Sequence, residues 1–342
     1  MTFGERLAER AWYGRDRRAR ALRVTLAPLG AAFEGIAALR GSLFEVGALR
    51  SYALALPSIS VGNLTVGGTG KTPVAAWVAA RLLERGARPA IVLRGYGGDE
   101  PLVHRVLNPA AIVVADRDRV AAVALAASQG ATMAVLDDAF QHRRARRDVD
   151  LVLVSADRWD GSTRALPAGP WREPLSALRR ATITLVTRKA VDADYAEEVQ
   201  RAVREAAPAV PTAIARLEPE ALRDEAGQAR PLDLLHGRRV LAISAIGDPR
   251  AFERQLTSLG AHVEPATYGD HHAFTAADAA SLARIADRAD VAVCTLKDAV
   301  KLWPLWPRGS APLWYVSQRL TVESGAAELD ASLDRLIRNG GA

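Results

Sequence analysis

Cysteine is nearly missing from this chain, because Cys294 is the single one among 342 residues. One thiol forms no internal disulfide, so the fold must depend on a buried apolar core. The first residues also lack the basic, apolar and small-residue order of a secretory signal. Both absences predict a cytoplasmic location.

Aromatic residues are scarce as well, at 6% of the chain. Proteins that bind single-stranded nucleic acid stack bases on aromatic side chains, and the sequence contains no recognisable nucleic-acid module. We therefore expect no nucleic-acid partner. The net charge of +6 still favours anionic partners, which leaves phosphorylated ligands and acidic membrane surfaces.

Lysine is rare too, since only four of the 45 basic residues are lysines. Arginine presents a broad planar fork, whereas lysine presents a compact ammonium on a flexible stem. Lys71 directly follows Gly70, which fits a point charge inside a narrow loop. The apolar fraction of 49% and the charged fraction of 25% are typical of a globular protein, and the length suits two domains.

A glycine-rich loop lies around that lysine, in VGGTGKTP at residues 66–73. The apolar segment PSISVGN before it is typical of a buried strand, and TPVAAWVAARLLERGA after it has helical spacing. Strand, glycine loop and helix are the context of a phosphate-binding loop, in which backbone N–H groups cradle phosphates. Thr65 stands where the strict pattern has glycine. The predicted nucleotide-binding residues are Thr65, Val66, Gly67, Gly68, Thr69, Gly70, Lys71 and Thr72.

Two adjacent carboxylates follow a second apolar segment, TMAVLDDAFQH at residues 132–142. Asp137 and Asp138 come at the carboxyl end of the expected strand, where open α/β sheets bind ligands. Mg²⁺ prefers oxygen ligands, so Thr72 with one of these two carboxylates is a candidate metal site. Alternation along a strand predicts that only one of them contacts the metal directly.

Further segments extend the pattern along most of the chain. In order they are RGYGG (94–98), GDEP (98–101), LDDAFQHRRARRDVDLVLV (136–154), LPAGPWREPLSALRRA (166–181) and GDHHAFT (269–275). Together with SVGNLTVGGTGKTP, this series resembles the tetraacyldisaccharide 4'-kinase family, the lipid A kinases of Gram-negative bacteria. The resemblance implies an α/β, P-loop NTPase-like, three-layer domain with a second, smaller α/β domain joined by an extended linker. It also implies transfer of the γ-phosphoryl group of ATP to the 4'-hydroxyl of a tetraacyldisaccharide 1-phosphate, with Mg²⁺.

The resemblance also implies roles for single residues. Asp99 is expected to be the base, assisted by His271, and Lys71 to act on the transferred phosphate. Glu173 joins the metal ligands, although a salt bridge or helix cap is its ordinary role. Arg119 and Arg172 are expected to meet the anionic substrate. Because the RGYGG and GDEP segments share Gly98, their connection is shorter than usual in the family, and Asp116 or Asp118 could replace Asp99.

The expected domains are residues 1–50, a basic and apolar helical region; 51–205, the kinase domain; 206–237, a linker or β-ribbon; and 238–342, a C-terminal α/β domain. In the first region the apolar segment 24–39 is too short to span a bilayer and is flanked by arginines. We expect it to lie at the cytoplasmic face of the bacterial inner membrane as a peripheral anchor, with a core-packing helix as the alternative. A P-loop ATPase or GTPase switch with a protein partner is the alternative function.

Overall fold

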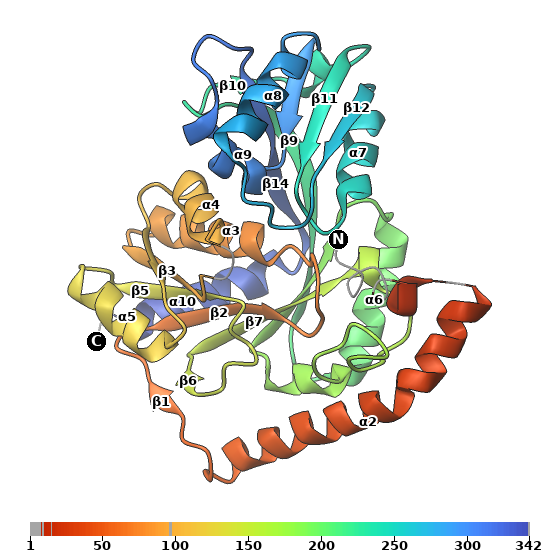
Figure 1. The fold of residues 1–342 in the computed structure, drawn as a ribbon. Helices are drawn as coiled ribbons and strands as arrows, with labels where there is room; N and C mark the ends of the chain where they lie inside the picture. The colour runs from red at the N-terminus through yellow and green to blue at the C-terminus, as the bar shows by residue number, and fades with distance from the viewer. Residues whose placement is uncertain (1–7, 9, 15, 96–97, 341–342) are drawn as a thin grey trace. The chain divides into compact units, whose positions relative to one another are not determined.

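The computed structural model describes residues 8, 10–14, 16–95 and 98–340, in two compact units (Figure 1). The smaller unit takes residues 98–103 and 218–319, and the larger unit takes the other described residues. Tyr96 and Gly97 of the RGYGG segment lie outside the described residues.

The larger unit is built on one row of parallel strands, as the predicted α/β class requires. In spatial order they are β9 (Thr212–Arg223), β8 (Ile183–Arg188), β7 (Val149–Ser155), β2 (Ser58–Asn63), β5 (Met133–Asp137), β3 (Pro89–Leu93) and β4 (Ile112–Ala115). Parallel neighbours need crossover connections, which helices supply. These are α3 (Lys71–Glu84), α5 (Arg119–Ser128), α6 (Ala193–Ala206) and α4 (Glu100–Leu107), whose first half belongs to the smaller unit. Helix α10 (Ala326–Gly340) follows the last strand of the chain and packs against the sheet. Short elements complete the unit: β1 (Tyr52–Ala53), β6 (Ala145–Arg146), and the 3₁₀ helices η1 (Ala156–Arg158) and η2 (Leu175–Arg180).

Alternation along the strands divides the core of this unit into two faces. On β3, Ile91 and Leu93 join the core that includes α3 and α10, whereas Ala90 and Val92 join the core that includes α5. Period-two side-chain direction produces this split. Helices therefore cover both faces of the sheet, which confirms the predicted three-layer arrangement.

Helix α10 belongs to the larger unit, although the sequence prediction grouped it with residues 238–342. Its Leu329, Leu333 and Leu336 are buried in the core beside α3. Asp330 also forms an ion pair with Arg81 of α3 at 3.0 Å. An amphipathic segment at the end of a chain can cover any open sheet face, so its sequence could not identify its partner.

The smaller unit is a second α/β layer with parallel strand pairs. Its row is β12 (His262–Thr267), β11 (Arg239–Ser244), β13 (Val291–Cys294) and β14 (Leu313–Ser324). The helices are α7 (Pro249–Ser258), α8 (Ala276–Ala286) and α9 (Leu296–Leu302), with the 3₁₀ helices η3 (Leu232–Leu235) and η4 (Trp303–Leu305). Strand β10 (Ala229–Arg230) pairs antiparallel with β9, inside the range expected to be a linker or β-ribbon. The predicted smaller α/β domain is thus present.

The N-terminal region forms one long helix, α2 (Arg17–Glu45), drawn as an extended rod in Figure 1. It has 29 residues, and by length and composition it is apolar enough to cross a membrane. The helix runs past both ends of segment 24–39. The sequence prediction excluded a membrane span because that segment is too short, but the length of the whole helix does not exclude one. Only Ala19 and Gly30 of the helix are buried, which contradicts the core-packing alternative.

Candidate active site

The predicted phosphate loop connects β2 to α3 in the larger unit. Asn63, the last residue of β2, is fully buried and links both halves of the loop. Its Nδ2 donates to Thr69 Oγ1 at 2.8 Å, and its Oδ1 accepts from Lys71 Nζ at 3.2 Å. The lysine is therefore already held over the loop, as a phosphate-binding lysine has to be.

Two glycines give the loop its backbone shape. Gly67 and Gly70 have φ of 105° and 88°, where residues with a side chain are strained. A Cβ on Gly70 would also lie 2.6 Å from Leu217 Cδ1. Gly67 and Gly68 are exposed, so their backbones can approach a ligand, and Thr72 is half-buried in the first turn of α3.

Thr65 begins the loop in a short β-bridge to Trp171. Next to it, Val66 N donates to Pro170 O at 2.8 Å, and Arg172 N donates to Leu64 O at 2.7 Å. The LPAGPWREPL segment therefore fixes the loop entry. A β-branched threonine suits this extended position, which explains why glycine is not needed there.

Asp138 lies beside the phosphate loop. Its Oδ1 is 3.7 Å from Lys71 Nζ and 3.1 Å from an Arg172 guanidinium nitrogen. Burial acts to raise the pKa of this carboxyl, but the charges of Lys71 and Arg172 outweigh burial and lower it below the ordinary value. The backbone of Asp138 is left-handed, with φ of 50°.

Asp137 points elsewhere, as alternation along β5 predicted. It is 5% exposed, and its Oδ2 lies 2.9 Å from Nε2 of His104, which is fully buried on α4. An ionised carboxylate only accepts hydrogen bonds, so with this partner Nε2 would be the donor. Among the described residues, Asp137 Oδ1 has no hydrogen-bond partner.

Arg119, at the start of α5, is 4% exposed. Its guanidinium donates to the carbonyl oxygens of Asp116 at 2.6 Å and of Asp137 at 3.3 Å. This arrangement braces the end of β5 and brings positive charge to the two carboxylates. The buried position favours bracing over direct contact with a substrate phosphate.

Glu173 forms an ion pair with Arg180 at 2.7 Å, and the Arg180 guanidinium covers the ring of Phe140. The ordinary salt-bridge role is therefore the one its surroundings support. Among the described residues, no group of three His, Cys, Asp or Glu side chains could hold a metal ion together. Thr72 and Asp138 remain the candidate oxygen ligands beside the loop.

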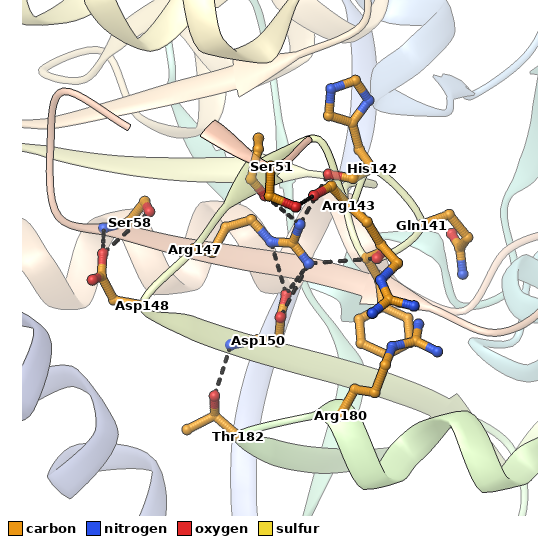
Figure 2. Close-up of polar contacts among 12 residues, drawn as sticks. Ser51, Ser58, Gln141, His142, Arg143, Arg147, Asp148, Asp150, Arg180 and Thr182 are labelled. Atoms are coloured by element: carbon orange, nitrogen blue, oxygen red, sulfur yellow. Dashed lines mark hydrogen bonds and ion pairs between the residues drawn. The ribbon is translucent and has the colours of Figure 1, made fainter. Parts of the chain in front are cut away.

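The arginine run after Phe140 is partly structural (Figure 2). Arg147 is nearly buried and forms an ion pair with Asp150 at 2.8 Å. Its guanidinium also donates to the carbonyl oxygens of His142 and Ala145. Burial raises the pKa of the Asp150 carboxyl, although Arg147 acts against the shift. Within the run Arg143, Arg144, Arg146 and Arg147, Arg147 therefore has a structural role.

The predicted base and its partner come together within the smaller unit. His271 Nδ1 lies 3.4 Å from Asp99 Oδ2, and Asp99 is 2% exposed. His271 has φ of 54° and, with Asp138, is one of the two residues other than glycine with positive φ in the described part of the chain. The two alternative candidates for the base accept hydrogen bonds from the local backbone. Asp118 caps α5 by accepting from Val120 N, and Asp116 accepts from Asp118 N. The shortened connection therefore leaves Asp99 paired with His271.

Sequence reasoning missed two residues here. Asn63 could have been noticed, because an amide at the end of a buried strand directly before a glycine loop needs partners. His104 gave no such signal, since it lies on an ordinary amphipathic helix, far from Asp137 in sequence. Only the packing of α4 brings it to the carboxylate.

Comparisons with known proteins place nearly the whole chain among related sequences and structures. The family model for tetraacyldisaccharide-1-P 4'-kinase matches residues 22–338. A tetraacyldisaccharide 4'-kinase of Anaeromyxobacter dehalogenans is 39% identical, over 90% of this chain and 88% of its own. One of Azoarcus sp. is 37% identical, over 92% of both chains. The crystal structure of LpxK from Aquifex aeolicus in complex with ATP is 29% identical, with a TM-score of 0.73 over 92% of this chain and 99% of that one.

Proposed function

The chain belongs to the tetraacyldisaccharide 4'-kinase family and is a kinase of lipid A biosynthesis, and from this we propose how its residues divide the work. The reaction moves the γ-phosphoryl group of ATP to the 4'-hydroxyl of a tetraacyldisaccharide 1-phosphate. One observation carries the assignment: Lys71, held by Asn63, lies on a glycine loop beside Asp138 and Arg172. The switch ATPase alternative leaves the family membership unexplained.

Phosphate binding falls to the loop from Thr65 to Thr72. Its backbone N–H groups would surround the β- and γ-phosphates of ATP, and Lys71 would bind their oxygens. Lys71 is positioned for this role, since its ammonium contacts both Asn63 Oδ1 and Asp138 Oδ1. Phosphoryl transfer depends on alignment and charge neutralisation, which this loop supplies.

The donor set beside the loop fits Mg²⁺. Asp138 stays ionised because its pKa is lowered, Thr72 adds a hydroxyl, and Asp137 has a buried carboxylate oxygen with no hydrogen-bond partner in the described chain. Nucleotide-bound Mg²⁺ keeps several waters and needs only one or two carboxylates. When bound, the ion would neutralise charge on the phosphates. We assign Thr72 and Asp138 as the nearest ligands, Asp137 as their support, and Glu173 to a bracing pair with Arg180.

Asp99 would accept the proton of the attacking 4'-hydroxyl. A general base must lie within hydrogen-bond reach of that proton and must be oriented. His271 provides the orientation at 3.4 Å, and it would pass the proton onward as a partner of the carboxylate. Arg172 keeps part of its side chain accessible and would pair with the phosphate of the lipid acceptor. Arg119 would add positive charge from its buried position at the end of β5.

Helix α2 would bind the membrane from which the lipid comes. Its exposed apolar side chains include Val24, Leu29, Ile36 and Leu39, and arginines dominate its N-terminal part. This composition suits the headgroup region of an anionic bilayer, here the cytoplasmic face of the inner membrane. At the other end, Arg40 donates to Gln141 O, and Gln141 Nε2 donates to Asn63 O. The helix is thus connected to the phosphate loop through Gln141.

The test is transfer of labelled γ-phosphate from Mg-ATP to a tetraacyldisaccharide 1-phosphate in detergent micelles. The parent protein should form the bis-phosphorylated product. Asp99→Asn, which keeps size and shape, should lower turnover about 10²- to 10⁴-fold without weakening ATP binding. Asp116→Asn is the matched control, since Asp116 is the carboxylate that could replace Asp99. ATP hydrolysis without lipid product would refute the kinase assignment. A loss of turnover in Asp116→Asn but not in Asp99→Asn would assign the role of base to Asp116.

A further inference from the structure

His271 has a left-handed backbone conformation that few residues other than glycine adopt. Its φ is 54°, in a region where histidine occurs more often than most side chains, as Asn and Asp do, but still rarely. Such a residue persists only where its surroundings hold it. The conformation matters because it directs Nδ1 toward Asp99, at 3.4 Å.

The peptide group before His271 is held through Ala245, the residue directly after β11. His271 N donates to Ala245 O at 3.1 Å. Ala245 N in turn donates to Asp298 Oδ2 at 3.0 Å, and Asp298 is fully buried on α9. The same Oδ2 accepts from Thr295 Oγ1 at 2.7 Å. A buried carboxylate thus fixes the backbone to which His271 is bonded.

The backbone one residue beyond His271 is held by Lys301, also on α9. Lys301 Nζ donates to His272 O at 3.2 Å and lies 3.1 Å from Asp298 Oδ1. It also lies 5.2 Å from the ring centroid of Phe274, with only 15% of the side chain exposed. A compact ammonium can join a carboxylate, a carbonyl and an aromatic face in so small a space, whereas a planar guanidinium demands a wider fork. This accounts for a lysine in a chain that otherwise prefers arginine.

We propose that the largely buried Asp298–Lys301 pair positions His271 for catalysis by holding the backbone before and after it, at Ala245 and at the carbonyl of His272. The inference rests on the proposed function, because it assumes that the Asp99–His271 pair acts on the acceptor hydroxyl. Asp298 and Lys301 touch neither substrate nor phosphate in this account. They act through His271 alone, and this distinguishes them from residues that only stabilise the fold.

The experiment is a double-mutant cycle with Lys301→Met and His271→Ala, measured by lipid phosphorylation. Lys301→Met keeps an apolar stem over Phe274 but removes the charge and the hydrogen bond. It should lower kcat about tenfold while leaving the KM for ATP unchanged, because a loosened base pair affects the chemical step. In the His271→Ala background, the same change should have no further effect on kcat. Lys297→Met, on the same helix, is the matched control and should behave as the parent.

Three outcomes would overturn the inference. Independent, multiplicative losses in the two backgrounds would show a general structural role, and an effect no larger than that of Lys297→Met would show no role. Full turnover by His271→Ala would show that the Asp99–His271 pair is not catalytic. In that case the proposed function fails, and this inference fails with it, whereas the first two outcomes leave the catalytic pair intact. Should Lys301→Met fail to fold, Asp298→Asn takes its place, since it keeps the acceptor for Ala245 N and loses the charge paired with Lys301.

Discussion

Replacing Gly70 by alanine tests whether the phosphate loop needs its observed backbone. Gly70 is the residue directly before α3, with φ of 88° and ψ of 19°. Alanine at this φ carries a backbone penalty of about 1 to 2 kcal/mol. Its Cβ would also stand 2.6 Å from Leu217 Cδ1, closer than two carbons can approach. Since Leu217 is 2% exposed, it has little room to turn away.

Overpacking of this kind costs about 1 to 3 kcal/mol in a closely packed core. Together with the backbone penalty, Gly70→Ala should destabilise the loop region by about 2 to 4 kcal/mol. For a unit of this size each kcal/mol corresponds to roughly 2 to 4 °C in Tm. We therefore expect the nucleotide-free Tm to fall by at least about 4 °C. The Kd for ATP should rise at least tenfold, which corresponds to about 1.4 kcal/mol.

The assay is thermal unfolding without nucleotide, followed by titration with ATP. Gly68→Ala is the matched control, because its added Cβ would meet no described heavy atom within 4 Å and its φ is not positive. Its Tm should equal that of the parent. Leu217→Val, combined with Gly70→Ala, removes the δ-carbon that the new Cβ would meet. The double variant should recover the part of the Tm loss that comes from overpacking and keep the part that comes from the backbone. An unchanged Tm for Gly70→Ala would refute the reasoning, and equal losses in both glycine variants would show that the loop responds to any side chain.

Two other predictions follow from buried and exposed positions. His104→Ala leaves the Asp137 carboxylate buried without its partner, so Tm should fall by the equivalent of about 3 to 5 kcal/mol, whereas His104→Gln should recover part of the loss by keeping a donor. Equal Tm values for parent and His104→Ala would contradict the pairing at 2.9 Å. Ile36→Glu, on the 67% exposed side chain of α2, should weaken binding to anionic vesicles about tenfold or more. Leu125→Glu, at an exposed apolar position of α5, should leave partitioning unchanged, and equal partitioning of both variants with the parent would exclude α2 as the anchor.

Local patterns accounted for much of this site before the structure was known. The strand, glycine loop and helix around Lys71 are contiguous in sequence, so spacing alone predicted them. Asp137 and Asp138 followed from a strand end in the same way. The partners of these residues did not follow, because His104 approaches Asp137 only when α4 packs, and Arg180 reaches Glu173 only when η2 folds back. Length misled the interpretation of residues 24–39, since helix formation continued well past the apolar segment.

The two strained residues link these observations. Asp138 and His271 have φ of 50° and 54°, and each lies where the sequence had placed a chemical role. Elsewhere in the described chain, positive φ is confined to glycine, so at these two positions a side chain is retained despite its backbone cost. For Asp138 the compensation is the pair of charges on Lys71 and Arg172, and for His271 it is the Ala245 carbonyl. A glycine would relax the backbone at either place and would remove a carboxylate or an imidazole. The sequence keeps the side chain in both cases, which is the pattern expected of residues that a reaction requires.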